Sequence, residues 1–284
     1  MSKLFLELGI TFREVVSEEE EGEIYSVLDN DIMFPYCIGV SAGITNGVSY
    51  ISKQKGRNLQ VMETYRNDKR YFGVGNFLKC KSIFGLDFTF DEIPNKLNIF
   101  DMDTYKNYEG KILVGVTNAK TGEAEYLDGK ELDDKAQMLR ATCAIPLFFP
   151  VIKINGNEYY DGGLCDPIPI RKAIADDNEK HLIVLTRPKG YIKKLNRNNK
   201  VAARILRKKY PNLEHILLTR HELYNETVKF CEELERQGKA IILRPTSEGA
   251  VDSFEKDTTK LRAAYDHGYN MAIENLDKIK SLFK

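Results

Sequence analysis

The chain has 284 residues, of which 42% are hydrophobic and 10% aromatic, so it can bury a substantial core and is not a disordered polypeptide. Its 42 basic and 42 acidic side chains give a formal net charge of zero, although these charges are unevenly distributed along the chain. Strand-like and helical stretches alternate, which is typical of an α/β protein with a sheet between layers of helices.

The first predicted element is a strand at residues 4–7, which contains the short apolar patch Leu4 to Leu6. Charged residues follow, so this segment is neither a signal peptide nor a membrane-spanning helix. The chain contains five cysteines without Cys-x-x-Cys or metal-ligand spacing, so we expect reduced thiols, no metal and no cofactor. We therefore expect a cytoplasmic protein whose contact with a membrane, at the inner surface, would be peripheral.

The next element carries the first candidate for chemistry. An apolar run at residues 34–38 precedes Gly39-Val40-Ser41-Ala42-Gly43, and a plausible helix follows. A serine on such a strand-turn-helix junction is presented at the carboxyl edge of a sheet, while the small neighbours allow strand and helix to pack closely. A structural turn or a phosphate-binding loop could have the same sequence, so this motif alone leaves the role of Ser41 open.

Further along the chain, a β-rich segment at residues 111–117 and a helical pattern at residues 130–140 precede the segment Ala141-Thr142-Cys143-Ala144-Ile145-Pro146-Leu147-Phe148-Phe149-Pro150. A strand-like stretch at residues 158–160 then ends in Asp161-Gly162-Gly163. Glycines beside Asp161 would allow its carboxylate to approach another loop closely, although Asp-Gly also occurs in ordinary turns.

The order and spacing of the serine motif, the Ala-x-x-Ala-x-Pro-x-x-Phe-x-Pro segment and Asp-Gly-Gly resemble the patatin-like phospholipase family. The resemblance implies a three-layer αβα fold with a mainly parallel central sheet, a catalytic domain at residues 1–174 and a C-terminal α/β extension at residues 175–284. It also implies that Ser41 is the nucleophile and Asp161 the general base. The glycines Gly39, Gly43, Gly162 and Gly163 would be needed for shape, and the N–H of Ala42, together with Gly9, would stabilise the oxyanion.

One segment departs from the family pattern. The family places a Gly-Gly-Gly-x-x-Gly loop after the first strand, whereas this chain reads Leu8-Gly9-Ile10-Thr11-Phe12-Arg13. Loss of a single oxyanion donor typically lowers turnover by about 10² to 10³. A decayed loop, a loop rebuilt from other backbone donors and an error in the upstream sequence are all consistent with the mismatch.

The C-terminal part differs from the rest of the chain in its distribution of charge. Residues 187–209, from Arg187 to Lys209, carry ten basic side chains and no acidic one. This stretch is either a surface for anionic lipid headgroups or a solvated face that pairs with acidic groups elsewhere. No nucleic-acid-binding motif accompanies it, so nucleic acid is not an expected partner. A helix at residues 212–237, a strand at residues 240–245 and a final helix at residues 258–283 complete the prediction.

The function that these observations predict is hydrolysis of lipid carboxylic esters, of the phospholipase A or lysophospholipase type, through an acyl-Ser41 intermediate. The substrate class comes from the resemblance, because no residue specifies an acyl length or headgroup. Acyl transfer to an alcohol would use the same intermediate. A catalytically impaired lipid- or partner-binding protein is the alternative, and it rests on the atypical loop.

Overall fold

The central feature of the computed structural model is an eight-stranded mixed sheet within residues 2–6, 18–73, 75–77, 81–246 and 255–283, which are the residues the structure describes. Five neighbouring strands, in the order β3-β2-β1-β7-β8, run parallel. The edge strands β4, β6 and β5 pair antiparallel. The strands are β1 Ser2–Leu6, β2 Tyr36–Val40, β3 Lys111–Asn118, β4 Ala124–Asp128, β5 Ile152–Ile154, β6 Asn157–Asp161, β7 Lys180–Val184 and β8 Ala240–Leu243.

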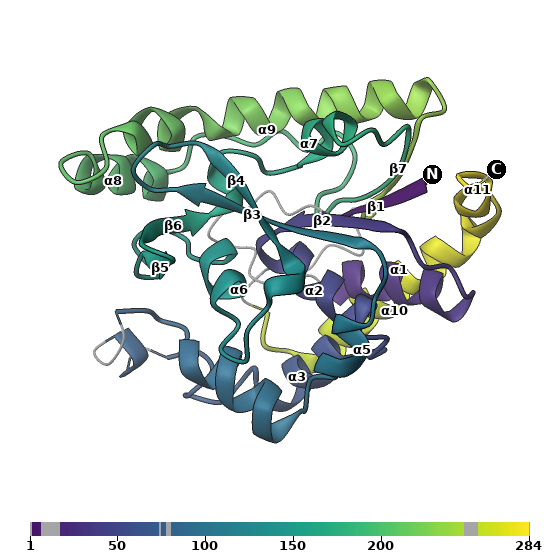
Figure 1. Cartoon of the computed structure of the whole chain (residues 1–284), viewed down its shortest axis with the longest axis horizontal. Helices are drawn as coiled ribbons and strands as arrows, with labels where there is room; N and C mark the ends of the chain where they lie inside the picture. Colours follow the sequence, from purple (N-terminus) through teal and green to yellow (C-terminus); the bar gives the residue numbers. More distant parts are fainter. Residues whose placement is uncertain (1, 7–17, 74, 78–80, 247–254, 284) are drawn as a thin grey trace.

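Helices cover both faces of this sheet (Figure 1). Those whose bounds are described include one π-helix, η1, and two 3-10 turns, η2 and η3. They are α1 Glu18–Asp29, α2 Ser41–Ile51, α3 Arg57–Tyr65, η1 Phe88–Leu97, α5 Met102–Lys106, η2 Gly129–Glu131, α6 Gln137–Thr142, η3 Gly162–Leu164, α7 Ile170–Ala175, α8 Arg197–Leu206, α9 Asn212–Arg236, α10 Thr258–Glu274 and α11 Leu276–Ser281.

Successive side chains of the central strands enter cores on opposite faces of the sheet, as the two-residue period of a strand requires. Cys37 and Leu182 belong to the core beneath α2, α10 and α11, whereas Ile38 and Ile183 belong to the core beneath α7 and α9. Figure 1 shows the same division, with α7 and α9 above the sheet and α1, α2 and α10 below it. The predicted three-layer α/β fold with a mainly parallel central sheet is confirmed.

Two predicted helices differ from the observed ones, and local side-chain bonding explains both. Residues 130–140 form only η2 and the start of α6, because Asp133 Oδ1 accepts hydrogen bonds from the N–H groups of Lys135 and Gln137 and ends regular structure there. The final helix is interrupted at Asn275, whose side-chain amide donates to the carbonyl of Met271 at 2.9 Å.

The C-terminal extension packs closely on the rest of the molecule. Strand β8 pairs with β7 and therefore continues the same sheet, and α10 packs along α1. The buried Arg66 donates through Nε to the carbonyl of Glu255 at 2.8 Å, and Arg262 pairs with Glu63. The boundary at residue 174 stays a prediction.

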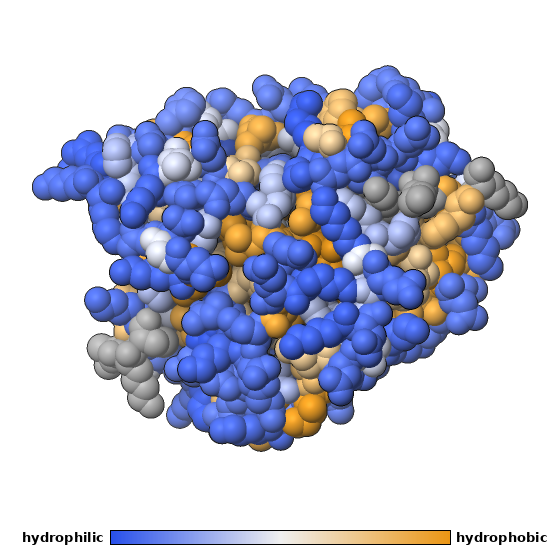
Figure 2. Space-filling model, in the orientation of Figure 1, coloured by the Kyte–Doolittle hydropathy of each residue, from blue (hydrophilic) through white to orange (hydrophobic). Residues whose placement is uncertain are grey.

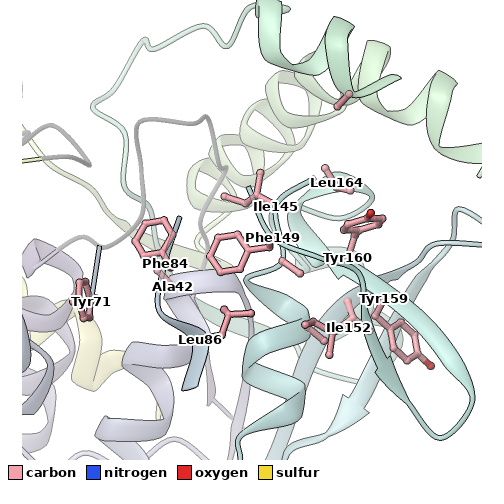
Figure 3. Close-up of a cluster of buried hydrophobic side chains, with 14 of the residues drawn as sticks. Ala42, Tyr71, Phe84, Leu86, Ile145, Phe149, Ile152, Tyr159, Tyr160 and Leu164 are labelled. Atoms are coloured by element: carbon pink, nitrogen blue, oxygen red, sulfur yellow. The ribbon is translucent and has the colours of Figure 1, made fainter. Parts of the chain in front are cut away.

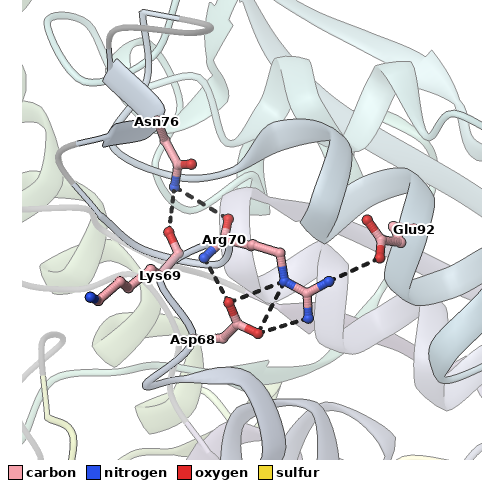
Figure 4. Close-up of polar contacts among 5 residues, drawn as sticks. All are labelled: Asp68, Lys69, Arg70, Asn76 and Glu92. Atoms are coloured by element: carbon pink, nitrogen blue, oxygen red, sulfur yellow. Dashed lines mark hydrogen bonds and ion pairs between the residues drawn. The ribbon is translucent and has the colours of Figure 1, made fainter.

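A segment between α2 and β3 forms the layer beneath α2, and an exposed ion-pair cluster fixes part of it (Figure 4). Arg70 donates to Asp68 at 2.8 Å and to Glu92 at 3.2 Å, which ties the loop before Tyr71 to η1. The amide of Asn76 donates to the carbonyls of Lys69 and Arg70. These bonds hold in place two elements that also line the cavity described below.

The face drawn in Figure 2 is mainly hydrophilic, with apolar residues exposed in patches across its centre. Among the described residues, no helix is both long and apolar enough to cross a bilayer.

Candidate active site

Ser41 lies at the junction of β2 and α2, on a sharp turn of the backbone. Its φ is 52°, a left-handed conformation that costs a non-glycine residue free energy and persists only where surrounding bonds hold it. One such bond is present, because the Ser41 N–H donates to Thr142 Oγ1 at 2.8 Å. The Thr142 hydroxyl in turn donates to the carbonyl of Gly115 in β3 at 2.5 Å. The serine is therefore fixed from its main chain, and its side chain is left available.

Asp161 ends β6, which lies on the other side of β3 from β2. Its main chain is held at both ends, because its N–H donates to the Ala144 carbonyl at 3.0 Å and its carbonyl accepts from Thr117 Oγ1 at 2.8 Å. Its side-chain Oδ1 accepts from the N–H of Gly163 at 2.7 Å. The carboxyl group is thus positioned on a rigid strand end, and the residue is only 1% exposed.

Two glycines allow β2, β3 and the turn after β6 to approach closely enough to share a site. A Cβ on Gly162 would lie 2.3 Å from the Gly115 carbonyl oxygen and 2.8 Å from Val40 Cγ1. A Cβ on Gly115 would lie 2.6 Å from the same Val40 atom. At Gly162 it is therefore this close approach, and not a positive φ, that excludes a larger side chain.

Replacing Gly162 with alanine is expected to destabilise the protein by about 1 to 3 kcal/mol, because the new methyl group overlaps backbone atoms that cannot move away. Urea unfolding measures this change. Gly75→Ala is the matched control, since no atom lies within 4 Å of its added Cβ, and it should change stability by less than about 0.5 kcal/mol. Equal unfolding midpoints for Gly162→Ala and the wild type would contradict the close approach.

Burial raises the pKa of the Asp161 carboxyl group, and the Ser41 hydroxyl, which lies beside it, is one of the groups that oppose this rise through hydrogen bonding. Among the described residues, however, Asp161 Oδ2 has no partner with normal hydrogen-bond geometry. The contact between Ser41 and Asp161 is therefore looser than a full hydrogen bond. Catalytic hydrogen bonds are often loose before substrate binds. Burial is the largest influence on Asp161 and raises its pKa to about 7, although neighbouring positive charges oppose that rise.

Two buried cations from the C-terminal part of the chain act on this carboxyl group, and the motif analysis did not find them. Arg220 on α9 is 4% exposed and donates through Nη2 to the Gly163 carbonyl at 2.8 Å. Lys193, which belongs to the basic stretch, is 3% exposed and lies over the ring of Tyr224. Both lower the pKa of Asp161, and Arg220 has the larger effect.

A sequence signal for Arg220 does exist. The buried residues of α9 recur at alternating intervals of four and three, which is a continuous core-facing stripe, and an arginine occupies one of these positions. A charged residue on a mainly apolar stripe indicates a buried partner. The stripe consists of Leu213, Leu217, Arg220, Tyr224, Thr227, Cys231 and Leu234.

Cys143 is a further neighbour of Ser41 that the motif analysis did not single out. Burial, and then the charge of Asp161, raise the pKa of its thiol far above the usual range, so the sulfur stays protonated at neutral pH. A protonated thiol is a poor nucleophile. Cys143 therefore does not compete with Ser41, but it contributes to the wall of the cavity.

Ser41 and Ala42 open onto a cavity of about 190 Å³ whose walls are largely apolar. Figure 3 shows part of this wall, with Ala42, Phe84, Ile145 and Phe149 close together. The rings of Phe84 and Phe149 stack with centroids 5.3 Å apart. Other apolar lining residues come from α2, α3, η1, α5, α6 and the loops between them, and include Val48, Val61, Met62, Tyr71, Phe90, Ile93, Phe100, Met102 and Leu139.

The other residues predicted for the site are placed as follows. Gly39 lies in β2 between Leu6 and Val114, and Gly43 is buried in the first turn of α2. Gly163 bonds both Asp161 and Arg220. Gly9 falls outside the described residues. No cluster of metal-ligating side chains occurs in the described part of the chain.

Two family models match this chain. The model of the family described as "Patatin-like phospholipase" matches residues 21–174, which contain both Ser41 and Asp161. A second model, "Domain of unknown function (DUF6363)", matches residues 210–284, which contain Arg220.

Among curated proteins, the chain is similar to the "Uncharacterized protein YjjU" of Escherichia coli (strain K12), with 26% identity over 165 residues. That alignment covers 54% of this chain and 43% of YjjU. Among solved structures, VipD from Legionella pneumophila is similar with a TM-score of 0.44 and 13% identity, over 97% of this chain and 66% of VipD. The chain thus spans less than two thirds of the length of either protein. Because the family model covers more than half of its residues, the chain belongs to the patatin-like phospholipase family.

Proposed function

We propose that the protein is a serine acyl hydrolase that cleaves carboxylic esters of lipids, of the phospholipase A or lysophospholipase type. The observation that carries the proposal is the meeting of three features at one place: a strained serine turn, a buried carboxyl group and an apolar cavity. Family membership supports the lipid substrate class. The cavity walls suit an acyl chain, because they bury apolar surface and leave few polar groups to satisfy.

In this proposal Ser41 and Asp161 act as a dyad. Asp161 accepts the proton of the Ser41 hydroxyl as Oγ attacks the ester carbonyl, and the acyl-serine intermediate forms as the alcohol leaves with that proton. Asp161 then takes a proton from water as that water attacks the acyl-serine, and it returns this proton to Ser41 Oγ as the acyl–Oγ bond breaks and the carboxylic acid leaves. A base with a pKa of about 7 is half ionised at neutral pH, which suits both proton acceptance and proton donation.

The negative oxygen of each tetrahedral intermediate needs donors that are fixed in advance. The N–H of Ala42 follows the nucleophile at the N-terminus of α2, where the helix dipole also favours negative charge. The proposed second donor, Gly9, lies outside the described residues. Because the family's glycine-rich loop is not matched here, a lipid-binding protein with little or no turnover remains the second candidate.

The experiment that separates these candidates is reaction of the purified chain with p-nitrophenyl butyrate, a longer-chain ester and a fluorophosphonate probe. A hydrolase turns over the esters and becomes labelled at Ser41. A binding protein does neither, but it retains affinity for a fatty acid or phospholipid measured by calorimetry. Labelling at a residue other than Ser41 would contradict the proposed nucleophile.

We also propose that the protein is cytoplasmic. Its basic stretch from Arg187 to Lys209 would contact the inner surface of an anionic membrane peripherally. Within this stretch, Lys209 pairs with Glu158 and Arg207 lies 4.0 Å from Glu214, so part of its charge is used inside the protein. Helix α8 instead exposes basic side chains next to apolar ones. Its outward residues are Arg197, Lys200, Val201, Arg204 and Ile205, with Val201 41% and Ile205 59% exposed. Such a face fits anionic headgroups and their apolar boundary.

Reversing two of these charges, Lys200→Glu with Arg204→Glu, is expected to weaken binding to phosphatidylglycerol-containing vesicles by about 30-fold or more, since each basic residue near an anionic membrane contributes about 1 kcal/mol. Vesicle co-sedimentation at fixed salt measures the change. The matched control is Lys278→Glu with Lys280→Glu on α11. Equal loss in both double variants, or equal binding to phosphatidylcholine alone, would contradict a specific role for α8.

A further inference from the structure

The C-terminal region reaches the site through one buried side chain. Helix α9 packs against the η3 turn that follows Asp161, and Arg220 is the charged residue on its buried face. Its Nη2 donates to the Gly163 carbonyl, while the Gly163 N–H donates to Asp161 Oδ1. The main chain of Gly163 therefore connects the guanidinium to the carboxylate. An arginine that is 4% exposed is rare unless a negative group compensates its charge.

Among the residues that the structure describes, the charged and titratable groups acting on Asp161 come from four directions. Arg220 approaches from α9, Lys193 from the loop before α8, Cys143 from the end of α6 and Ser41 from the start of α2. Cys143 is a neutral thiol at neutral pH, and Ser41 carries no charge. The positive potential at the carboxylate therefore comes from Arg220 and Lys193. Of these two, Arg220 also bonds to the Asp161-Gly162-Gly163 turn.

We propose that Arg220 is a positioning residue for Asp161: its guanidinium fixes the Gly163 carbonyl, and thereby the turn that orients the carboxylate, and supplies the buried positive charge that favours the ionised base. The inference rests on the proposed function of Asp161. Its consequence is that the region matched as a domain of unknown function is part of the active site, and not an appendage to it. A catalytic domain cut at residue 174 would lack this charge and this contact.

The physical argument is a balance between two large effects. Burial in an apolar environment favours the neutral form of a carboxyl group, whereas an opposite charge nearby favours the ionised form. For Asp161 these effects oppose each other, and the result is a pKa of about 7. Removal of the guanidinium takes away the largest influence that opposes burial and leaves only the Gly163 N–H, the Ser41 hydroxyl and Lys193 to lower the pKa, so the base would be mostly protonated at neutral pH.

The test compares Arg220→Gln, Arg220→Lys and the wild type in the full chain, with two readouts. The first is the pH titration of the Asp161 carboxyl ¹³C signal, assigned with Asp161→Asn. The second is the pH dependence of fluorophosphonate labelling at Ser41. In Arg220→Gln we expect both midpoints to rise by about 1 to 3 pH units. Arg220→Lys keeps a positive charge but loses the planar guanidinium group with its several N–H donors. We therefore expect a smaller rise in both midpoints and slower labelling.

Arg236→Gln is the matched control, because Arg236 lies on the same helix and pairs with Glu233 at the surface. It should leave both midpoints unchanged. Midpoints in Arg220→Gln and Arg220→Lys that equal those of the wild type would overturn the proposal. If Arg220→Gln does not fold, the test rests on Arg220→Lys. In that case a carboxyl titration midpoint and a labelling rate that both equal those of the wild type would overturn the proposal. Because the carboxyl titration requires no turnover, a shifted midpoint in an inactive protein would support the role of Arg220 and reject the proposed hydrolase.

Discussion

Replacing Ser41 with alanine is expected to abolish ester hydrolysis, with kcat/KM falling by about 10⁴-fold or more, and to abolish fluorophosphonate labelling. The substitution removes only Oγ. The Ser41 N–H would still donate to Thr142, and alanine adopts the left-handed backbone of this position at a cost similar to that for serine. We therefore expect an unfolding temperature close to that of the wild type, so that lost turnover reports on chemistry and not on folding.

Ser52→Ala is the matched control, since Ser52 is a buried serine just after the end of the same helix, and its hydroxyl bonds to Ser49 and Gln54. It should retain turnover and labelling. Wild-type turnover that Ser41→Ala shares would reject Ser41 as the nucleophile. Absence of turnover in the wild type, together with retained lipid affinity, would favour the binding protein and direct attention to the atypical segment after the first strand.

Replacing Asp161 with asparagine is expected to have the second largest effect, a loss of turnover at all pH values, because the amide cannot accept the serine proton. In the wild type, turnover should rise with pH through about 7 and level off above it, since the active form of the base is the ionised one. The measurement is kcat/KM from pH 5 to pH 9. The control is Asp166→Asn, a half-buried aspartate five residues further along the chain that accepts from Tyr126 and should keep the wild-type pH profile.

Asp161→Asn should lower turnover but raise the stability of the protein relative to the wild type as pH increases. The pKa of Asp161 is higher in the folded protein than the ordinary value of 3.8, so between these values the folded state binds more protons than the unfolded one. The free energy of unfolding contributed by this group therefore falls as pH rises from about 4 to 7, by about 4 kcal/mol in total.

Asp161→Asn removes this dependence. Its stability relative to the wild type should increase across that pH interval, as measured by urea unfolding at pH 4.5 and pH 8. A difference between the two proteins that stays constant with pH would mean that Asp161 has an ordinary pKa. It would also remove the argument that the base is tuned to neutral pH.

Local sequence was sufficient to predict the elements whose causes are local. The apolar runs that become β2 and β3 were recognised from their own residues, and the Gly-x-Ser-x-Gly and Asp-Gly-Gly motifs require small residues at defined positions. Predictions were wrong where a side chain bonds to main-chain groups of residues two to four positions away, as at Asp133 and Asn275. Such competition depends on one or two local hydrogen bonds and leaves little trace in an apolar pattern.

The sequence by itself thus determined the fold class, the family and the two side chains proposed for the chemistry, because motif order and strand pattern are properties of neighbouring residues. Only the tertiary structure decided that Asp161 is almost fully buried, that Thr142 holds the serine turn, and that Arg220 and Lys193 reach the carboxyl group from far along the chain. The pKa of a carboxyl group depends on the water excluded around it and on charges a few ångströms away, and folding brings these charges together from distant parts of the sequence.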